Sequence, residues 1–155
     1  MQRRKLHFDN VEQVMADIDV LHRDGYQRLG NWSLGEMCDH FSIFAEKSLD
    51  KFDTKVPWLF RQTIGRIIFP FILAGKIPKG IKAPPEMEPK KPTSDDPTLS
   101  IERLRKALLA VGKATDAQFT EHPFAGKISA EKWRRAQIAH CEYHLGFLIP
   151  NPPRK

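Results

Sequence analysis

The sequence predicts an all-α protein, a four-helix bundle with a long irregular connection between its second and third helices. Four segments repeat apolar residues at helical spacing, and no segment shows strand-like alternation of comparable strength. With 155 residues, 41% hydrophobic and 28% charged, the chain has the size and composition of one globular domain. We therefore expect a single domain over residues 1–155, with an excursion over residues 52–98.

The first helix is expected between residues 9 and 25. Asp9 or Asn10 can cap its start, and Gly25 can end it. Its apolar residues recur at helical spacing: Val11, Val14, Ile18 and Leu21. This pattern predicts one buried face and one solvated face.

The second helix has the clearest start in the chain. Ser33 and Glu36 stand at the spacing of a capping box, in which each residue satisfies a backbone N–H group of the other. Trp32 and Met37 occupy the positions of a hydrophobic staple around the same cap. The helix is therefore expected to begin directly after Ser33.

Two further helices are expected in the second half of the chain. The third lies within residues 98–119, where an apolar stripe favours a helix: Ile101, Leu104, Leu108 and Val111. The fourth lies within residues 128–150, with Ser129 as its cap and Ile128 and Trp133 as its staple. Pro150 lies beyond its end.

The excursion at 52–98 contains one apolar segment, residues 56–73, followed by a stretch rich in Pro and Lys. The segment is about long enough to span a membrane, but Arg61 and Arg66 lie inside it and Pro70 is expected to break it. A transmembrane helix is therefore not expected. The segment can instead cover a core, close over a pocket or lie on a membrane surface, and covering is the commoner role.

Composition and motifs exclude several classes of function. The net charge of +6 favours anionic partners, but the basic residues are scattered among 19 acidic ones, so nucleic acid binding is not expected. Phosphate loops, dinucleotide fingerprints and Gly-x-Ser-x-Gly elbows are absent, so no organic cofactor is expected. The cysteines are Cys38 and Cys141, too few for a disulfide-stapled fold, and no signal peptide is seen, so a cytoplasmic location is expected.

Three histidines are the candidates for chemistry. His140 and His144 are four residues apart in the fourth helix, so both should face the bundle interior. His40 shares a face of the second helix with Phe41 and Phe44. Each ring can serve as a polar core residue that donates to a carbonyl group. Three inward imidazoles favour a divalent metal instead, because burying several such rings without partners is costly.

Residues near these histidines are expected to have structural roles. Glu142 lies about 200° around the helix from His140 and is expected to face outward. Cys141 is expected to be a small buried core residue. His122, in a loop, fits a turn or capping role better than a ligand role. Gln137, one turn before His140, is the candidate for orienting its ring.

The sequence resembles the DinB-like (also called YfiT-like) superfamily of metalloenzymes. The matching stretches are "GNWSLGEMCDHF" and "HPFAGKISAEKWRRAQIAHCEYHLGFL", and the resemblance covers residues 1–51 and 98–149. It is similar in particular to an uncharacterised bacterial branch of that superfamily. The resemblance implies a four-helix bundle in which His40, His140 and His144 bind a divalent metal. Characterised relatives include transferases that use low-molecular-weight thiols such as bacillithiol, mycothiol or glutathione.

Three hypotheses about function follow. The first is an enzyme that depends on zinc or nickel and transfers a small thiol, with no catalytic residue assigned beyond the three ligands. The second is a bundle that binds a metal or small ligand without turnover. The third is a peripheral membrane or partner-binding protein that uses residues 56–73 and the positive charge. A homodimer is compatible with all three.

Overall fold

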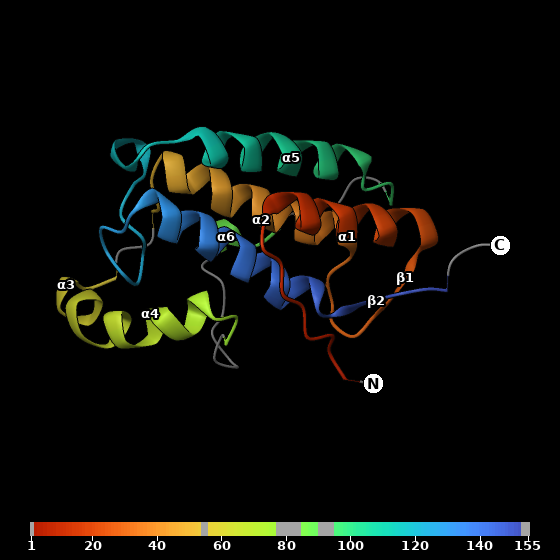
Figure 1. Ribbon diagram of the computed structural model, residues 1–155, viewed down its shortest axis with the longest axis horizontal. Helices are drawn as coiled ribbons and strands as arrows, with labels where there is room; N and C mark the ends of the chain where they lie inside the picture. The colour runs from red at the N-terminus through yellow and green to blue at the C-terminus, as the bar shows by residue number, and fades with distance from the viewer. Residues whose placement is uncertain (1, 54–55, 77–84, 90–94, 153–155) are drawn as a thin grey trace.

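The computed structural model describes residues 2–53, 56–76, 85–89 and 95–152, and it is mostly helical with a small two-stranded sheet. The long helices are α1 (Val11–Asp24), α2 (Leu34–Leu49), α5 (Thr98–Lys113) and α6 (Ala130–Leu145). They lie side by side (Figure 1), with α2 packed against both α5 and α6, and α1 in contact with the other three. This arrangement agrees with the bundle expected from the sequence.

The predicted helix caps are confirmed. The side chain of Asn10 caps α1, and Gly25 ends it with a φ of 77°, a left-handed conformation that glycine adopts at little cost. At the start of α2, the Glu36 carboxylate accepts from Ser33 N at 2.7 Å, and Ser33 Oγ accepts from Glu36 N at 3.3 Å. Ser129 caps α6 in the same way. Local side-chain chemistry therefore determines where these helices begin.

The connection between α2 and α5 is long, as expected, but the prediction that it is irregular is wrong for one part of it. The segments α3 (Trp58–Phe60), η1 (Arg61–Gly65) and α4 (Arg66–Leu73) follow one another without a break, and a short 3₁₀ turn, η2 (Pro85–Met87), comes later. Pro70 lies inside α4 and does not end it. Phe69 packs against residues of α6 and of the loop before it. The free energy gained from this packing offsets the cost of the backbone hydrogen bond that the proline cannot donate.

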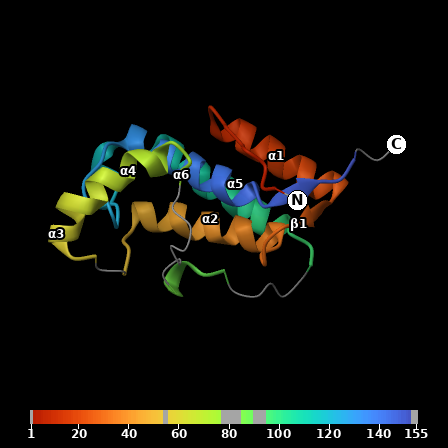
Figure 2. The same cartoon turned by 90° about the horizontal axis from the view of Figure 1, so that it is seen from below.

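Helix α4 lies across α6 and the loop before it (Figure 2). Gly65, at the end of η1, lies so close to this loop that a Cβ atom at this position would stand 1.8 Å from the carbonyl oxygen of Phe124. The ring of Phe69 lies 4.8 Å from that of His122, centroid to centroid. The helix is thus held by its inner face. No helix in the described parts of the chain has both the length and the apolar content needed to cross a membrane.

The two-stranded sheet was not predicted. Strand β1 (Tyr26–Arg28) pairs antiparallel with β2 (Leu148–Pro150), with Gln27 opposite Ile149. Each strand has only three residues, too few to show an alternating pattern in the sequence. The pairing joins the chain after α1 to the chain after α6, and this fixes the ends of both helices relative to each other.

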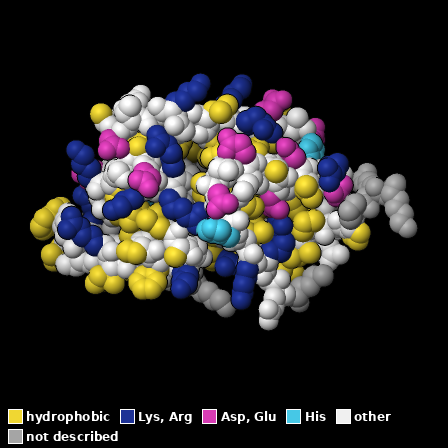
Figure 3. Space-filling model, viewed as in Figure 1, with side chains coloured by type: hydrophobic (Ala, Val, Ile, Leu, Met, Phe, Trp, Pro, Cys, Tyr) yellow, Lys and Arg dark blue, Asp and Glu magenta, His cyan; other side chains and the backbone are white. Residues whose placement is uncertain are grey.

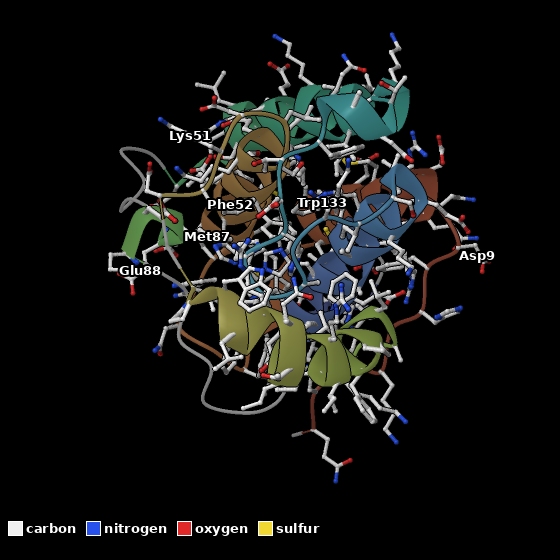
Figure 4. All side chains as sticks on the ribbon, turned by 90° about the vertical axis from the view of Figure 1, so that its left-hand side faces the viewer. Asp9, Lys51, Phe52, Met87, Glu88 and Trp133 are labelled. Carbon is white, nitrogen blue, oxygen red and sulfur yellow. The ribbon has the colours of Figure 1, made fainter. Side chains whose placement is uncertain are left out.

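The main core lies between the four long helices and includes residues from each of them: Ile18, Leu34, Phe41, Leu104 and Leu145. Cys38 and Cys141 are fully buried in this cluster, which confirms the core role predicted for Cys141. A second cluster joins Phe44, Met87 and Trp133, so the connection between α2 and α5 contributes a side chain to the interior. Figure 4 shows Met87 turned toward the bundle and Glu88 turned away from it.

Candidate metal centre

The structure brings together the three histidines selected from the sequence. His40 comes from α2, and His140 and His144 lie one turn apart on α6. Their ring centroids are 4.7 Å apart for His40 and His140, 4.9 Å for His40 and His144, and 4.8 Å for His140 and His144. One candidate ligand atom from each lies within 4.8 Å of the other two. His40 is buried, and the other two rings are half-buried.

Aromatic side chains surround the three histidine rings. The ring of Phe44 stands edge-on to His140 at 4.7 Å, and that of Phe41 does so at 5.5 Å. Trp32 stacks on His144 at 5.4 Å with an angle of 23° between the ring planes. The rings thus have apolar neighbours on several sides, which restricts their rotation and limits access of water.

A backbone hydrogen bond sets the tautomer of His40. Its Nδ1 lies 2.6 Å from the carbonyl oxygen of Met87, which can only accept, so Nδ1 carries the proton. In the neutral ring, Nε2 is then left with a free lone pair, and it lies 2.8 Å from Nε2 of His140. Nδ1 of His140 is buried and has no hydrogen-bond partner.

Burial keeps these rings neutral. It lowers the pKa of His140 well below the usual value for histidine, and the neighbouring His40 and His144 lower it further. Burial, with smaller contributions from His40 and Arg3, lowers the pKa of His144 to about 3. Burial also lowers the pKa of His40, against the opposing effect of the bond to Met87. All three rings therefore offer lone pairs at neutral pH.

The donor set fits a divalent ion. Two imidazole nitrogens bound to one tetrahedral zinc ion lie about 3.3 Å apart, so the 2.8 Å between His40 and His140 requires only a small outward movement of the rings. Among the described residues, the cluster contains no carboxylate or thiol that would neutralise the ion. An ion bound by these rings would keep its full charge and have room for a further ligand.

The residue that orients His40 was not predicted. Gln137, the candidate selected from the sequence for orienting His140, is buried, but its Nε2 donates to Ser48 Oγ at 3.4 Å. The orienting contact comes instead from the backbone carbonyl of Met87, and it is made to His40. A main-chain acceptor in a segment rich in Pro and Lys leaves no side-chain signal in the sequence. The stacking of Trp32 on His144 was also missed, since Trp32 was assigned only to the staple.

The prediction that Glu142 faces outward is wrong. Its side chain is buried, and its Oε1 accepts from Phe8 N at 2.7 Å. Arg135 donates to both of its carboxylate oxygens, at 3.0 and 2.8 Å. The spacing placed Glu142 correctly away from the histidines, but the N-terminal segment around Phe8 covers that side of α6. Such a long-range contact, across 134 residues, cannot be read from helical periodicity.

His122 has the turn role predicted for it. Its Nδ1 accepts from the backbone N–H groups of Phe124 and Ala125, at 3.2 and 3.3 Å. Its ring is buried 4.9 Å from that of Trp133, and burial lowers its pKa to about 3. It is not a member of the three-histidine cluster.

Two further groups bear on chemistry at this centre. Burial raises the pKa of the Cys38 and Cys141 thiols far above their usual value, so neither supplies a thiolate at neutral pH. Arg3 was not singled out in the sequence, yet its guanidinium lies 4.6 Å from the ring centre of Tyr143, next to His144. A positive charge therefore stands close to one edge of the histidine cluster.

Fold and site together define a mostly helical protein with a partly buried three-histidine cluster that could hold a metal ion. The chain belongs to the family described as "Protein of unknown function (DUF1569)", which matches residues 1–151. Comparison with curated proteins gave no match, and comparison with solved structures gave none either.

Proposed function

We propose that this protein is a divalent-metal-dependent enzyme of the DinB-like type, in which His40, His140 and His144 hold the ion. The observation that carries the proposal is the 2.8 Å approach of Nε2 of His40 to Nε2 of His140, with the proton of His40 held on Nδ1 by Met87. Zinc or nickel is the ion we favour, because imidazole suits both.

A hydrogen bond between the two rings accounts less well for this geometry. A hydrogen bond from Nε2 of His140 to His40 leaves His144 without a role in the cluster. Nδ1 of His140 has no hydrogen-bond partner under either account, so it does not decide between them. A divalent ion accepts a lone pair from each of the three rings, and this is a common reason for histidines from two helices to converge.

The reaction we propose is the transfer of a low-molecular-weight thiol to a carbon electrophile, in which the S–H proton is lost to water, a carbon–sulfur bond forms and the electrophile releases its leaving group. A divalent ion bound by neutral imidazoles acts as a Lewis acid that favours the thiolate form of a thiol. The thiol must come from outside the chain, because Cys38 and Cys141 are buried as neutral thiols. Arg3, next to His144, can bind a carboxylate of those small thiols that carry one, such as glutathione.

Metal analysis tests the site. After gentle purification and reloading with zinc or nickel, the wild type should carry about one ion per chain. His40→Ala and His144→Ala should lose the ion, whereas the matched variant of a distant histidine, His22→Ala, should keep it. At an ion concentration of about 100 times Kd, the wild type should gain about 2.7 kcal/mol of stability, or roughly 5–10 °C in Tm. A wild type without near-stoichiometric metal after reloading would refute the site.

Turnover tests the enzyme. A panel of small thiols with electrophiles should show metal-dependent transfer that a chelator abolishes and added metal restores. Arg3→Gln should raise KM for the thiol with little change in kcat, while Arg28→Gln, on the exposed strand β1, should change neither. Stoichiometric metal without turnover of any thiol in the panel would favour the second hypothesis, a metal-binding bundle without catalysis.

A further inference from the structure

The outer face of the helical segment Trp58–Leu73 is unusually apolar. Five of the seven large hydrophobic side chains that are exposed in the described parts of the chain lie on it: Trp58 (66% exposed), Leu59 (67%), Ile64 (48%), Ile67 (68%) and Phe71 (54%). Figure 3 shows hydrophobic and basic side chains intermixed over α3 and α4. We call these five side chains the apolar face. Clusters of this kind mark interaction surfaces in proteins that otherwise bury such residues.

The orientation of this face is fixed by packing on the opposite side of the helix. Gly65 lies directly against the backbone of Phe124, and Phe69 is buried against Ala125 and Ala136. The guanidinium of Arg61 is paired with Glu121, which ties the start of the segment to the same loop. The segment is therefore docked on the protein, and its apolar face is presented outward.

The charged residues that the segment itself contributes are all basic. The sequence has no Asp or Glu from residue 54 to residue 85. Arg66 and Lys76 are exposed beside the face, at the start of α4 and just beyond its end. A two-fold interface between copies of the chain would bring these unneutralised cations toward their own copies, which is unfavourable. A surface that carries phosphate groups above an apolar layer complements both the cations and the hydrophobic side chains.

We propose that the apolar face docks on the surface of a bilayer that contains anionic phospholipids. The helix lies in the interface with four hydrophobic side chains of the apolar face among the upper acyl chains, while Arg66 and Lys76 meet lipid phosphates. Trp58 sits at the headgroup level, where its ring has both apolar and polar neighbours. None of these residues belongs to the histidine cluster, so this inference is independent of the proposed enzymatic function.

Vesicle sedimentation with the full chain tests the proposal. The wild type should bind vesicles of about 30% phosphatidylserine in phosphatidylcholine, and should bind pure phosphatidylcholine roughly tenfold or more weakly. The double variant Ile67→Ser/Phe71→Ser should weaken binding at least about tenfold. Its matched control, Leu99→Ser/Leu109→Ser, removes the two large exposed hydrophobic side chains of the described residues that lie outside the apolar face, both on α5, and should bind like the wild type. Equal binding by the two double variants would overturn the proposal.

Two further measurements separate the contributions of charge and insertion. Arg66→Gln/Lys76→Gln should remove most of the preference for anionic vesicles, whereas Lys106→Gln/Lys113→Gln, on α5, should keep it. Lipids brominated on the acyl chain should quench tryptophan fluorescence in the wild type and much less in Trp58→Phe. The proposal would be overturned if the wild type does not bind anionic vesicles but forms a dimer, and if Ile67→Ser/Phe71→Ser dissociates that dimer. The apolar face would then be assigned to contact with a second copy of the chain.

Discussion

The pair formed by Arg135 and Glu142 should contribute far more to stability than a pair of the same geometry on the surface. Glu142 accepts one bond from Phe8 N and two from Arg135, with its side chain 4% exposed and that of Arg135 29% exposed. Removing one partner of a buried ion pair costs about 3–5 kcal/mol, because the other charge is left uncompensated. Partial exposure of Arg135 reduces this, and we expect Glu142→Gln to lower the free energy of unfolding by about 2–3 kcal/mol.

The chain offers a matched control in Glu46 and Arg103. Arg103 also donates two hydrogen bonds to the Glu46 carboxylate, at 2.8 and 2.6 Å, but the side chain of Glu46 is 46% exposed and that of Arg103 is 44% exposed. A double-mutant cycle by urea denaturation, with Glu→Gln and Arg→Met at each pair, should give a coupling energy of about 1.5–3 kcal/mol for the buried pair. The surface pair should give about 0.2–1 kcal/mol. Coupling energies that agree within about 0.5 kcal/mol would refute the role given to burial.

Three further predictions follow from single sites. Burial lowers the pKa of His122 to about 3 in the folded chain, whereas in the unfolded chain this ring takes up a proton at about pH 6.5. Protonation therefore favours the unfolded chain as the pH falls, and it should lower the free energy of unfolding by about 2 kcal/mol between pH 7.5 and pH 5. Urea denaturation should show that loss reduced in His122→Asn, whose amide oxygen can still accept the turn N–H groups; an unchanged pH dependence would contradict it. Gly65→Ala should cost about 1–3 kcal/mol and expose α4 to protease, since its Cβ meets Phe124, while Gly112→Ala, with open space around it, should be neutral or stabilising. Ser33→Ala should lower the free energy of unfolding by about 1 kcal/mol through loss of the capping box, which thermal or urea denaturation would detect.

Features with local causes could be predicted from the sequence. The helix starts after Asn10, Ser33 and Ser129 follow from hydrogen bonds that span three residues, so the sequence contains both partners within one turn. The inward position of His140 and His144 follows from helical periodicity alone, and their meeting with His40 follows once α2 and α6 pack together.

Features that depend on distant parts of the chain could not be predicted. The pairing of β1 with β2 joins segments separated by more than a hundred residues, and each is too short to show a pattern. Glu142 was placed on the solvent side because nothing in α6 reveals that Phe8 returns to cover it. The helical segment at 58–73 was obscured by Pro70, whose cost is offset by tertiary packing of Phe69.

The hydrogen bond from His40 to the carbonyl of Met87 has a thermodynamic consequence. It makes the basicity and orientation of a proposed metal ligand depend on the position of η2, a turn in the connection outside the long helices. A molecule that binds to η2 and shifts it must then change the affinity for the ion, and by reciprocity the ion must change the affinity for that molecule by the same factor. Binding of a substrate at η2 and binding of the metal ion would then be thermodynamically coupled.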